Sequence, residues 1–446
     1  MGFFEEYHSK LCTPQEAVRI VKSGDWIDYG SFNGKPVALD QALAARANEL
    51  EDIKIRGVYS MTPVQAALSD PERKSFLYNT WHMSGLEREL HDRNICNYIP
   101  IALHEVDKVY SGLTTNVAML AVSPMDNRGF FNVGPQALHS RTIVNNARYI
   151  LLEINKNMPV ALGGNDELIH ISEVNHVVET DNPHLAQVKT PSPDDIEMAI
   201  AERVIEEIID GCCLQLGIGT LPNLIGKMIA ASGFRHLGIH TDILVDSVVD
   251  MYDAGCIDGT RKATDPRKIV YSFAIGTQKL YTFLNNNPVC SIHSGSYTNN
   301  PLIAARNPYF VAINNCLEVD LYGQIASEAL EGRNISGGGG QLDFVKIGYM
   351  SRSGKGIVCL TSTYKDKEGR VMSRIRPALG SGTVTTLPRN MTHYVATEWG
   401  VVNLKGRSSW ERAEMLVSIA HPNFRDELIR EADRLKIWVK SNKISH

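Results

Sequence analysis

The chain has 446 residues, of which 43% are hydrophobic, 21% charged and 7% aromatic, and its formal net charge is −5. At roughly 100 to 200 residues per domain, this length allows two or three domains with large buried cores. The near-average composition excludes a disordered, coiled-coil or collagen-like chain, and the acidic balance gives no basic surface for nucleic acid or an anionic membrane. We therefore expect a globular protein with no nucleic acid and no membrane among its partners.

Two features predict a cytoplasmic location. The N-terminal stretch MGFFEEYHSK carries acidic residues where a secretory signal needs basic ones, and no later stretch approaches the ~20 apolar residues of a membrane span. The eight cysteines form no C-x-x-C pair and no metal-ligand spacing, which is typical of reduced thiols in an intracellular protein. We expect no bound metal ion.

The chain contains one internal repeat. Residues 13–37 and 190–223 both follow one plan of capped helix, glycine stop, strand, glycine turn and proline. In the first copy Thr13 opens a T-x-x-E capping box, and in the second we expect Ser192 to begin the helix and Gly211 to end it. The glycines that flank each strand are six residues apart in both copies. The sequence therefore predicts a duplicated α/β domain.

The order of the elements predicts parallel sheets. Runs rich in β-branched residues, such as RYILLEI at 148–154 and RKIVYSFAI at 267–275, alternate with helical patterns. A polar segment with three prolines precedes the second copy of the repeat, so we expect two halves, 1–189 and 190–446. The chain from Ser409 onward has the apolar spacing of two helices broken at His421-Pro422. The fold class is α/β, with two pseudo-symmetric open domains and mainly parallel sheets.

Two glycine-rich segments are candidate ligand-binding sites. In CCLQLGIGTLPN an apolar strand leads through a G-x-G turn into a helix expected from about Pro222. Such a turn either simply reverses the chain or brings the N–H groups of a helix N-terminus close to an anionic ligand. The four consecutive glycines of SGGGGQLDF, residues 336–344, lose much backbone entropy on ordering, which favours a place where the backbone approaches a ligand or another segment.

Several acidic residues are candidates for chemistry. Asp242 falls at the end of an expected strand, and ligands bind at the carboxyl edge of parallel strands; the alternative is that Asp242 or Thr241 caps the next helix. Glu318 and Glu328 stand beside expected tight turns, where carboxylates are more often hydrogen-bonded structural groups. His240 has no His or Cys at ligand spacing, so we expect it to support or pack rather than to bind a metal.

Nearly the whole chain resembles the family I coenzyme A transferases, in the acetyl-CoA hydrolase/transferase branch that includes butyryl-CoA:acetate and 4-hydroxybutyrate CoA-transferases. The resemblance rests on the repeat and on these motifs: PMDNRGFFNVG, LQLGIGTLPN, GIHTDILVDSVVDMYDAG, NNPLIAARN, LEVDLYGQIASE, SGGGGQLDF, THYVATEWGVVNLKGRSSWERA and IAHPNFR. It implies two α/β halves with the active site in the second half facing the first. It also implies transfer of coenzyme A between a short-chain acyl-CoA and a carboxylate such as acetate, with ping-pong kinetics.

The resemblance assigns roles to particular residues. The nucleophile position of the GIHT-acid motif is Asp242, where the family has Glu, and the side chain is therefore shorter by one methylene, roughly 1 to 1.5 Å of reach. We expect impaired transfer as a result. Asn300 is implied as a side-chain donor to the oxyanion. The implied coenzyme A contacts are Gly217, Ile218, Gly219, Thr220, Leu221, Leu317, Gly339 and Gly340, the last two as backbone donors to the thioester oxyanion as well.

Two alternatives to transfer stay open on the sequence. The shortened carboxylate of Asp242 leaves space for a water and suits a general base, which would make the protein an acyl-CoA hydrolase. A protein that keeps the fold and has lost turnover would be a coenzyme A-binding sensor. The resemblance implies no cofactor beyond coenzyme A as a substrate, and an α/β enzyme of this size is expected to be a homo-oligomer.

Overall fold

The computed structural model describes residues 2–437, and the chain folds into two compact units. The first unit contains the chain up to Lys189 together with His240–Val249 and Lys268–Asn300. The second contains Thr190–Ile239, Asp250–Arg267 and residues 301–437. Helix α10 (Asp246–Asp253) begins in the first unit and ends in the second.

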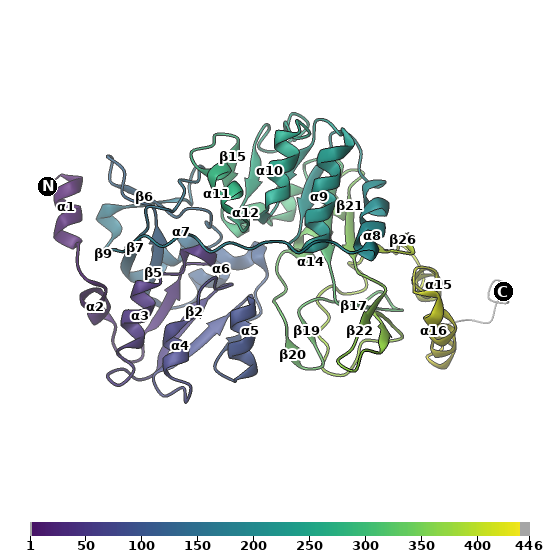
Figure 1. The fold of residues 1–446 in the computed structure, drawn as a ribbon, viewed down its shortest axis with the longest axis horizontal. Helices are drawn as coiled ribbons and strands as arrows, with labels where there is room; N and C mark the ends of the chain where they lie inside the picture. The colour runs from purple at the N-terminus through teal and green to yellow at the C-terminus, as the bar shows by residue number, and fades with distance from the viewer. Residues whose placement is uncertain (1, 438–446) are drawn as a thin grey trace. The chain divides into compact units, whose positions relative to one another are not determined.

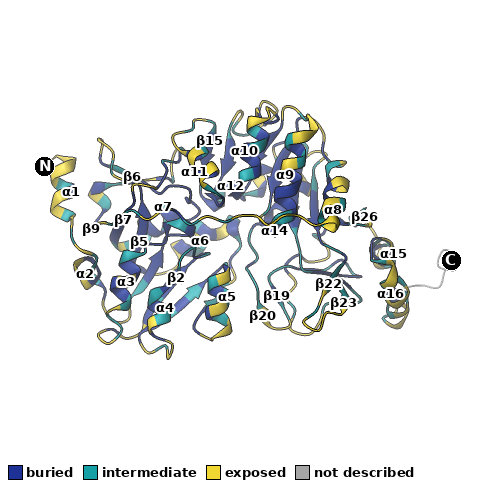
Figure 2. Ribbon diagram, in the orientation of Figure 1, coloured by how far each residue is buried: buried dark blue, intermediate teal, exposed yellow. Residues whose placement is uncertain are grey.

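The first unit is built on a seven-stranded sheet in the order β4-β3-β2-β1-β5-β7-β9, and every neighbouring pair in it is parallel. Most residues of its central strands are buried (Figure 2). Its strands are β1 (Trp26–Tyr29), β2 (Ile53–Gly57), β3 (Phe76–Thr80), β4 (Asn97–Tyr98), β5 (Thr115–Val122), β7 (Ala147–Ile154) and β9 (His176–Glu179). Smaller strands of the unit are β6 (Phe130–Asn132), β8 (Leu168–His170), β12 (Ile243–Leu244), β13 (Ile269–Tyr271), β14 (Phe273–Ala274) and β15 (Cys290–Ile292).

Helices pack on this sheet, with α3 against α4 and α7 against β5 (Figure 1). The helices of the first unit are α1 (Phe3–Lys10), α2 (Pro14–Ala17), α3 (Ala38–Ala44), α4 (Gln65–Ser69), α5 (Gly85–Asp92), α6 (Val106–Ser111), α7 (Ser140–Asn146), α11 (Gln278–Leu284) and α12 (Gly295–Thr298). Helix α2 begins as predicted, because the side chains of Thr13 and Glu16 each accept the other's backbone N–H.

The second unit repeats the same plan. Strand β10 pairs in parallel with β11 and with β16, β16 with β21 and β21 with β25, while β26 closes the edge antiparallel. These strands are β10 (Cys213–Leu216), β11 (Gly238–His240), β16 (Phe310–Asn315), β21 (Lys355–Cys359), β25 (Tyr394–Thr397) and β26 (Gly400–Asn403). Shorter strands are β17 (Glu318–Asp320), β18 (Ile325–Ala326), β19 (Ala329–Leu330), β20 (Arg333–Asn334), β22 (Thr363–Lys365), β23 (Val371–Ser373) and β24 (Ile375–Arg376).

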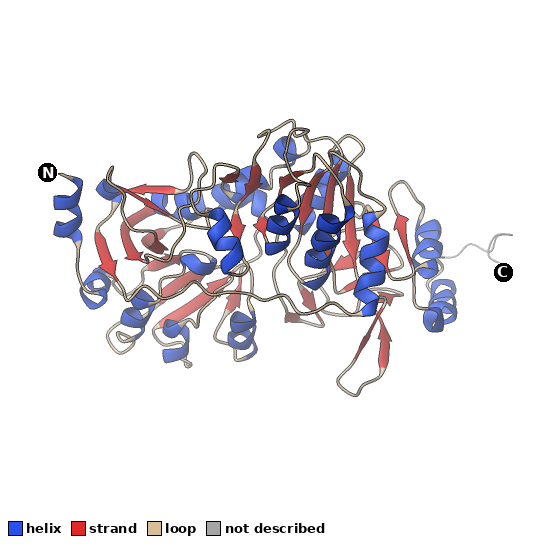
Figure 3. Ribbon diagram, turned by 45° about the horizontal axis from the view of Figure 1, so that its top comes forward, coloured by secondary structure: helices blue, strands red, loops and turns tan. Residues whose placement is uncertain are grey.

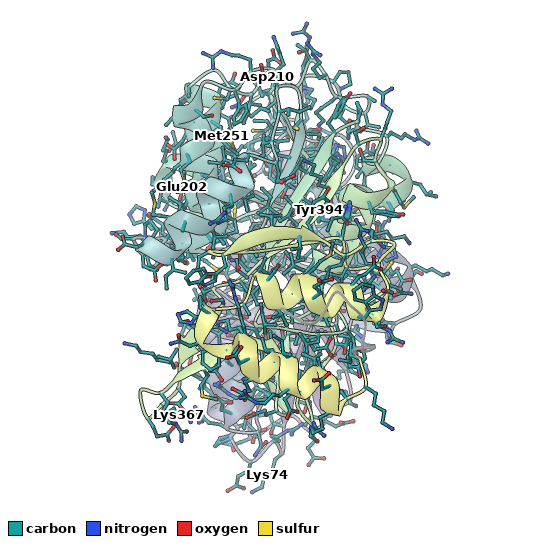
Figure 4. The ribbon with its side chains drawn as sticks, turned by 90° about the vertical axis from the view of Figure 1, so that its right-hand side faces the viewer. Lys74, Glu202, Asp210, Met251, Lys367 and Tyr394 are labelled. Atoms are coloured by element: carbon teal, nitrogen blue, oxygen red, sulfur yellow. The ribbon has the colours of Figure 1, made fainter. Side chains whose placement is uncertain are left out.

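The helices of the second unit are α8 (Asp195–Ile205), α9 (Thr220–Ser232), α13 (Pro301–Ala304), α14 (Gln341–Met350), α15 (Ser409–Ser418) and α16 (Pro422–Arg434). In Figure 3 the β22–β23 hairpin extends away from these helices. Figure 4 looks onto α15 and α16 and labels Tyr394 on β25 and Lys367 in the turn between β22 and β23. Both terminal helices are where the sequence predicts them, since His421 caps α16 and Pro422 takes its first position.

The predicted fold class is confirmed: the two units share one strand plan, and their main sheets are mostly parallel. Two details of the second repeat are wrong. Asp194 rather than Ser192 caps α8, because its side chain accepts the N–H of Glu197 in a capping box, and α8 ends at Ile205, before Gly211. Gly211 still has a positive φ of 80°, in the turn that precedes β10.

The expected division into halves, 1–189 and 190–446, stays a prediction. In the structure, residues 240–249 and 268–300 group with the first unit, and two of their N–H groups donate to residues of its N-terminal part: Ala274 to Pro135 O at 2.8 Å and Ile292 to Leu162 O at 2.8 Å. No helix within residues 2–437 combines the length and the hydropathy that crossing a membrane requires.

Candidate active site

Asp242 lies between two short strands, directly after Thr241 and before β12. Helix α10 begins only at Asp246, four residues later, so the alternative that Asp242 or Thr241 caps this helix is wrong. The carboxylate therefore stands at a strand end, in the position that the sequence predicts for chemistry.

The backbone holds Asp242 firmly. Its carbonyl oxygen accepts the N–H groups of Ser272 and Phe273, both at 3.0 Å, and the N–H of Ile243 donates to its carboxylate Oδ1 at 2.9 Å. The residue is only 6% exposed. These hydrogen bonds hold the backbone of Asp242 in place and orient one oxygen of its carboxylate. A nucleophile needs a fixed orientation of this kind.

His240 and Asn300 belong to the same unit as Asp242. His240 is fully buried, and its Nε2 lies 2.9 Å from the carbonyl oxygen of Thr298, to which an N–H there donates. Asn300 follows α12 and donates its backbone N–H to Tyr297 O at 3.2 Å; it is half-buried. His240 thus has the supporting contact expected of it, while Asn300 stays a predicted oxyanion donor.

The first glycine segment lies in the second unit, where Gly217, Ile218 and Gly219 join β10 to α9. Helix α9 begins at Thr220, two residues earlier than the predicted start at Pro222. Gly219 directly precedes the helix and has φ 123° and ψ −179°. Side chains rarely adopt this conformation, so glycine is required. Ile218 and Gly219 are exposed, Thr220 is half-buried and Leu221 is buried. The turn thus presents open backbone at the start of a 13-residue helix.

The second glycine segment enters α14 in the same unit. Gly339 has φ 55°, and Gly340 directly precedes the first residue of the helix. Gln341 anchors this start, because its side-chain Nε2 donates to the backbone oxygen of Asn315 at 2.7 Å and its Oε1 accepts from Ser327 Oγ at 2.7 Å.

Asn315 links the two glycine segments, and sequence reasoning missed it. It ends β16, its backbone receives Gln341, and its Nδ2 lies 3.2 Å from where a Cβ on Gly219 would stand. Within residues 2–437 its side-chain Oδ1 is buried with no hydrogen-bond partner. The signal was present in the two asparagines that end the strand FVAINN. The starts of α9 and α14 therefore meet at one edge of the second unit's sheet.

Glu318 is a structural carboxylate. It is buried and forms an ion pair with Arg376, whose Nε lies 2.7 Å from its Oε1. Burial alone would lower the pKa of Arg376, but the Glu318 carboxylate raises it above its ordinary value. Next to it, the carbonyl oxygen of half-buried Leu317 accepts from Arg374 Nη1 at 3.0 Å. Glu328 holds a turn through its backbone oxygen, which accepts the N–H of Ile335 at 2.7 Å.

The cysteines do not suit nucleophilic roles. Burial raises the pKa of Cys213 to about 12 and likewise that of Cys290, so both are thiols at neutral pH. Within the described residues no three His, Cys, Asp or Glu side chains are placed to hold a metal ion. The carboxylate of Asp242 therefore stays the strongest candidate nucleophile.

Family models identify the class of this α/β protein. The N-terminal domain of acetyl-CoA hydrolase/transferase matches residues 2–189, and the C-terminal domain of the same family matches residues 276–432. The chain belongs to the acetyl-CoA hydrolase/transferase family.

Particular relatives share its full length. The chain is 46% identical to butyryl-CoA:acetate CoA-transferase of Anaerostipes caccae, over 99% of this chain and the whole of that protein. It is 36% identical to 4-hydroxybutyrate coenzyme A transferase of Clostridium kluyveri, over 97% of this chain and 99% of that one. The crystal structure of RipA from Yersinia pestis matches with a TM-score of 0.89 and 34% identity, covering 98% of this chain and all of that one.

Proposed function

We propose that this protein transfers coenzyme A from a short-chain acyl-CoA, such as butyryl-CoA, to a free carboxylate, with acetate as the acceptor. The supporting observation is the 46% identity to a butyryl-CoA:acetate CoA-transferase over 99% of this chain and the whole of that protein. The relatives named acetyl-CoA hydrolase are only 22 to 23% identical, so hydrolysis has less support.

In the proposed first half-reaction, a carboxylate oxygen of Asp242 attacks the acyl carbonyl carbon. The carbon–sulfur bond breaks, coenzyme A leaves as thiolate, and a mixed anhydride forms between the acyl group and the enzyme. The thiolate then attacks the aspartyl carbonyl carbon, the anhydride carbon–oxygen bond breaks, and the first carboxylate leaves. Coenzyme A is now held as an enzyme thioester, and no water is consumed.

The second half-reaction reverses these steps with acetate. Its oxygen attacks the thioester carbon of the enzyme and expels the thiolate, and the thiolate then attacks the acetyl carbonyl of the new anhydride. Acetyl-CoA leaves and the carboxylate of Asp242 is restored. Because the anhydride and the thioester both keep the carbonyl activated, a carboxylate suits this exchange better than a hydroxyl would.

The other predicted residues receive binding roles in this proposal. The turn Gly217–Leu221, Leu317, Gly339 and Gly340 contact coenzyme A, and Asn300 donates to the oxyanion. Exposed backbone at Ile218 and Gly219, directly before α9, supports the contact at the first turn, since helix N-termini favour anionic groups.

One assay separates transfer from its alternatives. The protein is incubated with butyryl-CoA, with and without acetate, while acetyl-CoA and free coenzyme A are followed. Acetyl-CoA that forms only with acetate supports transfer. Free coenzyme A released without an acceptor would show a hydrolase, and tight coenzyme A binding without either product would show a sensor.

A homo-oligomeric state, a cytoplasmic location and the lack of any cofactor beyond coenzyme A stay predictions.

A further inference from the structure

One arginine of the second unit has a guanidinium that bonds only to uncharged oxygens. Arg374 directly precedes β24 and is half-buried. Its Nε donates to Thr361 Oγ1 at 3.2 Å, and its Nη1 donates to the carbonyl oxygen of Leu317 at 3.0 Å. Within residues 2–437 Arg374 forms no ion pair, and its Nη2 donates no hydrogen bond. The edge of the guanidinium that Nη1 and Nη2 form is therefore left for another acceptor.

The neighbouring arginine takes the nearby carboxylate. Arg376 Nε donates to Glu318 Oε1 at 2.7 Å, and its Nη2 donates to the hydroxyl oxygen of Tyr364 at 3.0 Å. The ring of Tyr364 lies against both arginines, whose guanidinium carbons are 4.8 Å (Arg374) and 5.8 Å (Arg376) from its centroid. We call Arg374, Arg376, Glu318 and Tyr364 the arginine cluster. With two cations and one anion, the cluster carries one unbalanced positive charge.

This unbalanced charge is unfavourable in the protein alone. Burial lowers the pKa of Arg374 below its ordinary value, and the charge of Arg376 adds to this effect. At Arg376 burial acts in the same direction, but the Glu318 carboxylate outweighs it and raises the pKa. An arginine stays protonated in a protein, so Arg374 remains charged and is stabilised by an anion that reaches it. The edge of a guanidinium binds a phosphate through two parallel hydrogen bonds. The cluster therefore has the charge and the donors of a phosphate-binding site.

The arginine cluster lies beside the two glycine segments. Leu317, which accepts from Arg374, comes two residues after Asn315, and two residues span at most about 7 Å. Asn315 in turn approaches Gly219 before α9 and accepts from Gln341 at the start of α14. All of these residues belong to the second unit. An anion bound to Arg374 thus lies next to the turns that the proposed function assigns to coenzyme A.

We propose that Arg374 binds a phosphate group of coenzyme A and thereby selects donors that carry the phosphorylated end of this molecule. The proposal rests on the proposed transfer of coenzyme A. In butyryl-CoA the acyl chain and the pantetheine arm are uncharged, so the diphosphate and the 3′-phosphate are the anionic groups that a guanidinium binds. Arg374 is thus a specificity-determining residue, which acts on the binding of the donor and takes no part in the chemical steps.

The test uses three donors with acetate as acceptor: butyryl-CoA, butyryl-3′-dephospho-CoA and butyryl-pantetheine. Because hydrogen bonds between ionised groups are strong, we expect Arg374→Gln to lower kcat/KM for butyryl-CoA by about 30-fold, mainly through KM. With butyryl-pantetheine, which has no phosphate, the variant and the wild type should have the same kcat/KM. A difference that disappears already with butyryl-3′-dephospho-CoA assigns Arg374 to the 3′-phosphate, and a difference that persists with this donor assigns it to the diphosphate.

Two further variants separate binding from structure. Arg374→Lys keeps the charge and loses the paired donors, so its loss should be smaller than that of Arg374→Gln and confined to the same donors. It also decides the question if Arg374→Gln fails to fold. Arg412→Gln is the matched control, since Arg412 is a buried arginine of the same unit that donates to the backbone oxygens of Tyr322 and Arg407, but it belongs to α15. This control should lower thermal stability and leave the ratios of kcat/KM among the three donors unchanged.

Three results overturn this proposal alone: a variant of Arg374 that uses butyryl-CoA as well as the wild type does, equal losses with all three donors, or a rise in KM for acetate in place of a rise for butyryl-CoA. A wild type that forms no acetyl-CoA from butyryl-CoA and acetate overturns the proposed function and this proposal with it.

Discussion

The two units place different chemistry at equivalent positions of the same strand. Asp28 on β1 and Gln215 on β10 each come four residues after the first glycine of their repeat. Asp28 receives two hydrogen bonds from Arg56, from Nε and Nη2 at 2.7 Å each, and one from Thr115 Oγ1 at 2.6 Å. Gln215 instead exchanges two amide hydrogen bonds with Asn314, at 3.0 and 3.2 Å.

The turns after these strands diverge in the same way. In the first unit Phe32, whose backbone has a positive φ, begins a helical turn of three residues. In the second unit Gly219 stands at the equivalent position, directly before the 13-residue helix α9. The duplication thus preserves the strand plan, while the residues after each strand differ: a buried phenylalanine follows β1 and an exposed glycine follows β10. Substitutions in each unit can measure how far the two differ.

The largest expected effect concerns the carboxylate that only one unit contributes. Asp242→Asn removes the nucleophilic oxygen with little change of shape, and we expect transfer to fall by about 10⁴-fold or more. Mass spectrometry of the protein after incubation with butyryl-CoA should show a coenzyme A adduct in the wild type and none in the variant.

Asp242→Glu is the companion variant. The added methylene restores the reach expected of this position, and we expect transfer to rise by on the order of 100-fold, because a misplacement of about 1 Å costs that much. A variant that transfers no faster than the wild type would contradict our account of the shorter side chain.

The buried ion pair of the first unit should contribute far more to stability than a partly exposed pair of the second. Arg56→Met leaves the fully buried Asp28 carboxyl without its cationic partner, which should lower the free energy of unfolding by about 3 to 5 kcal/mol. Lys355→Met breaks a partly exposed pair with Glu207 and should cost about 0.2 to 1 kcal/mol. Urea unfolding of both variants measures the contrast, and equal losses would refute it.

Buried histidines should make the first unit sensitive to acid. Burial lowers the pKa of His139 to about 3, with a contribution from Arg56, and the ring lies between Trp81 and Tyr110. The unfolded chain takes up this proton near pH 6.5 while the fold does not, so stability falls as the pH drops from 6.5 towards 3. The loss is about 1.4 kcal/mol per pH unit.

His139→Phe should remove this slope while keeping an aromatic ring in place. The free energy of unfolding at pH 7 and pH 5 measures it, with exposed His8→Phe as the control. The second unit offers a comparison in His393, because burial lowers the pKa of its ring to about 4. The loss of stability that His393 causes on acidification should therefore level off about one pH unit higher than the loss that His139 causes. An unchanged slope in His139→Phe would contradict the assignment.

The last comparison distinguishes the cost of backbone strain from the loss of substrate binding at two glycines of the second unit. Gly219→Ala and Gly233→Ala both place a side chain at positive φ, at the two ends of α9, and each should cost about 1 to 2 kcal/mol of stability. Only Gly219 lies at the proposed coenzyme A contact, so only its variant should raise KM for butyryl-CoA, by about tenfold. Equal KM values in the two variants would remove the turn from the proposed binding site.

Local chemistry in the sequence predicted much of this fold. The T-x-x-E box at Thr13, the strand at 148–154 and the break at His421-Pro422 each depend on residues close together in the chain, and each is confirmed. The start of α8 was misplaced because Asp194 competes with Ser192 as a cap, and Asp194 is the one that stands three residues before a glutamate, Glu197, as a capping box requires.

The remaining features depend on how distant segments meet. The ring contacts of Tyr59 with Phe32 and His82 require β1, β2 and β3 to be neighbours in this order, and no residue type at 32 or 59 signals a positive φ. Asn315 gains its position only because α14 and the β10–α9 turn converge on the end of β16. The family resemblance placed Asp242 at the site, but pattern and spacing alone left it as one of two interpretations.

The interleaved path of the chain bears on its synthesis. The first unit includes residues 240–249 and 268–300, so it is incomplete until at least 300 residues have left the ribosome. At about 5 to 20 residues per second, the N-terminal 189 residues wait on the order of ten seconds for the segments that contain Asp242 and Phe273. A gene cut at the repeat boundary would therefore yield an N-terminal fragment that keeps all seven strands of its main sheet and lacks the segments 240–249 and 268–300.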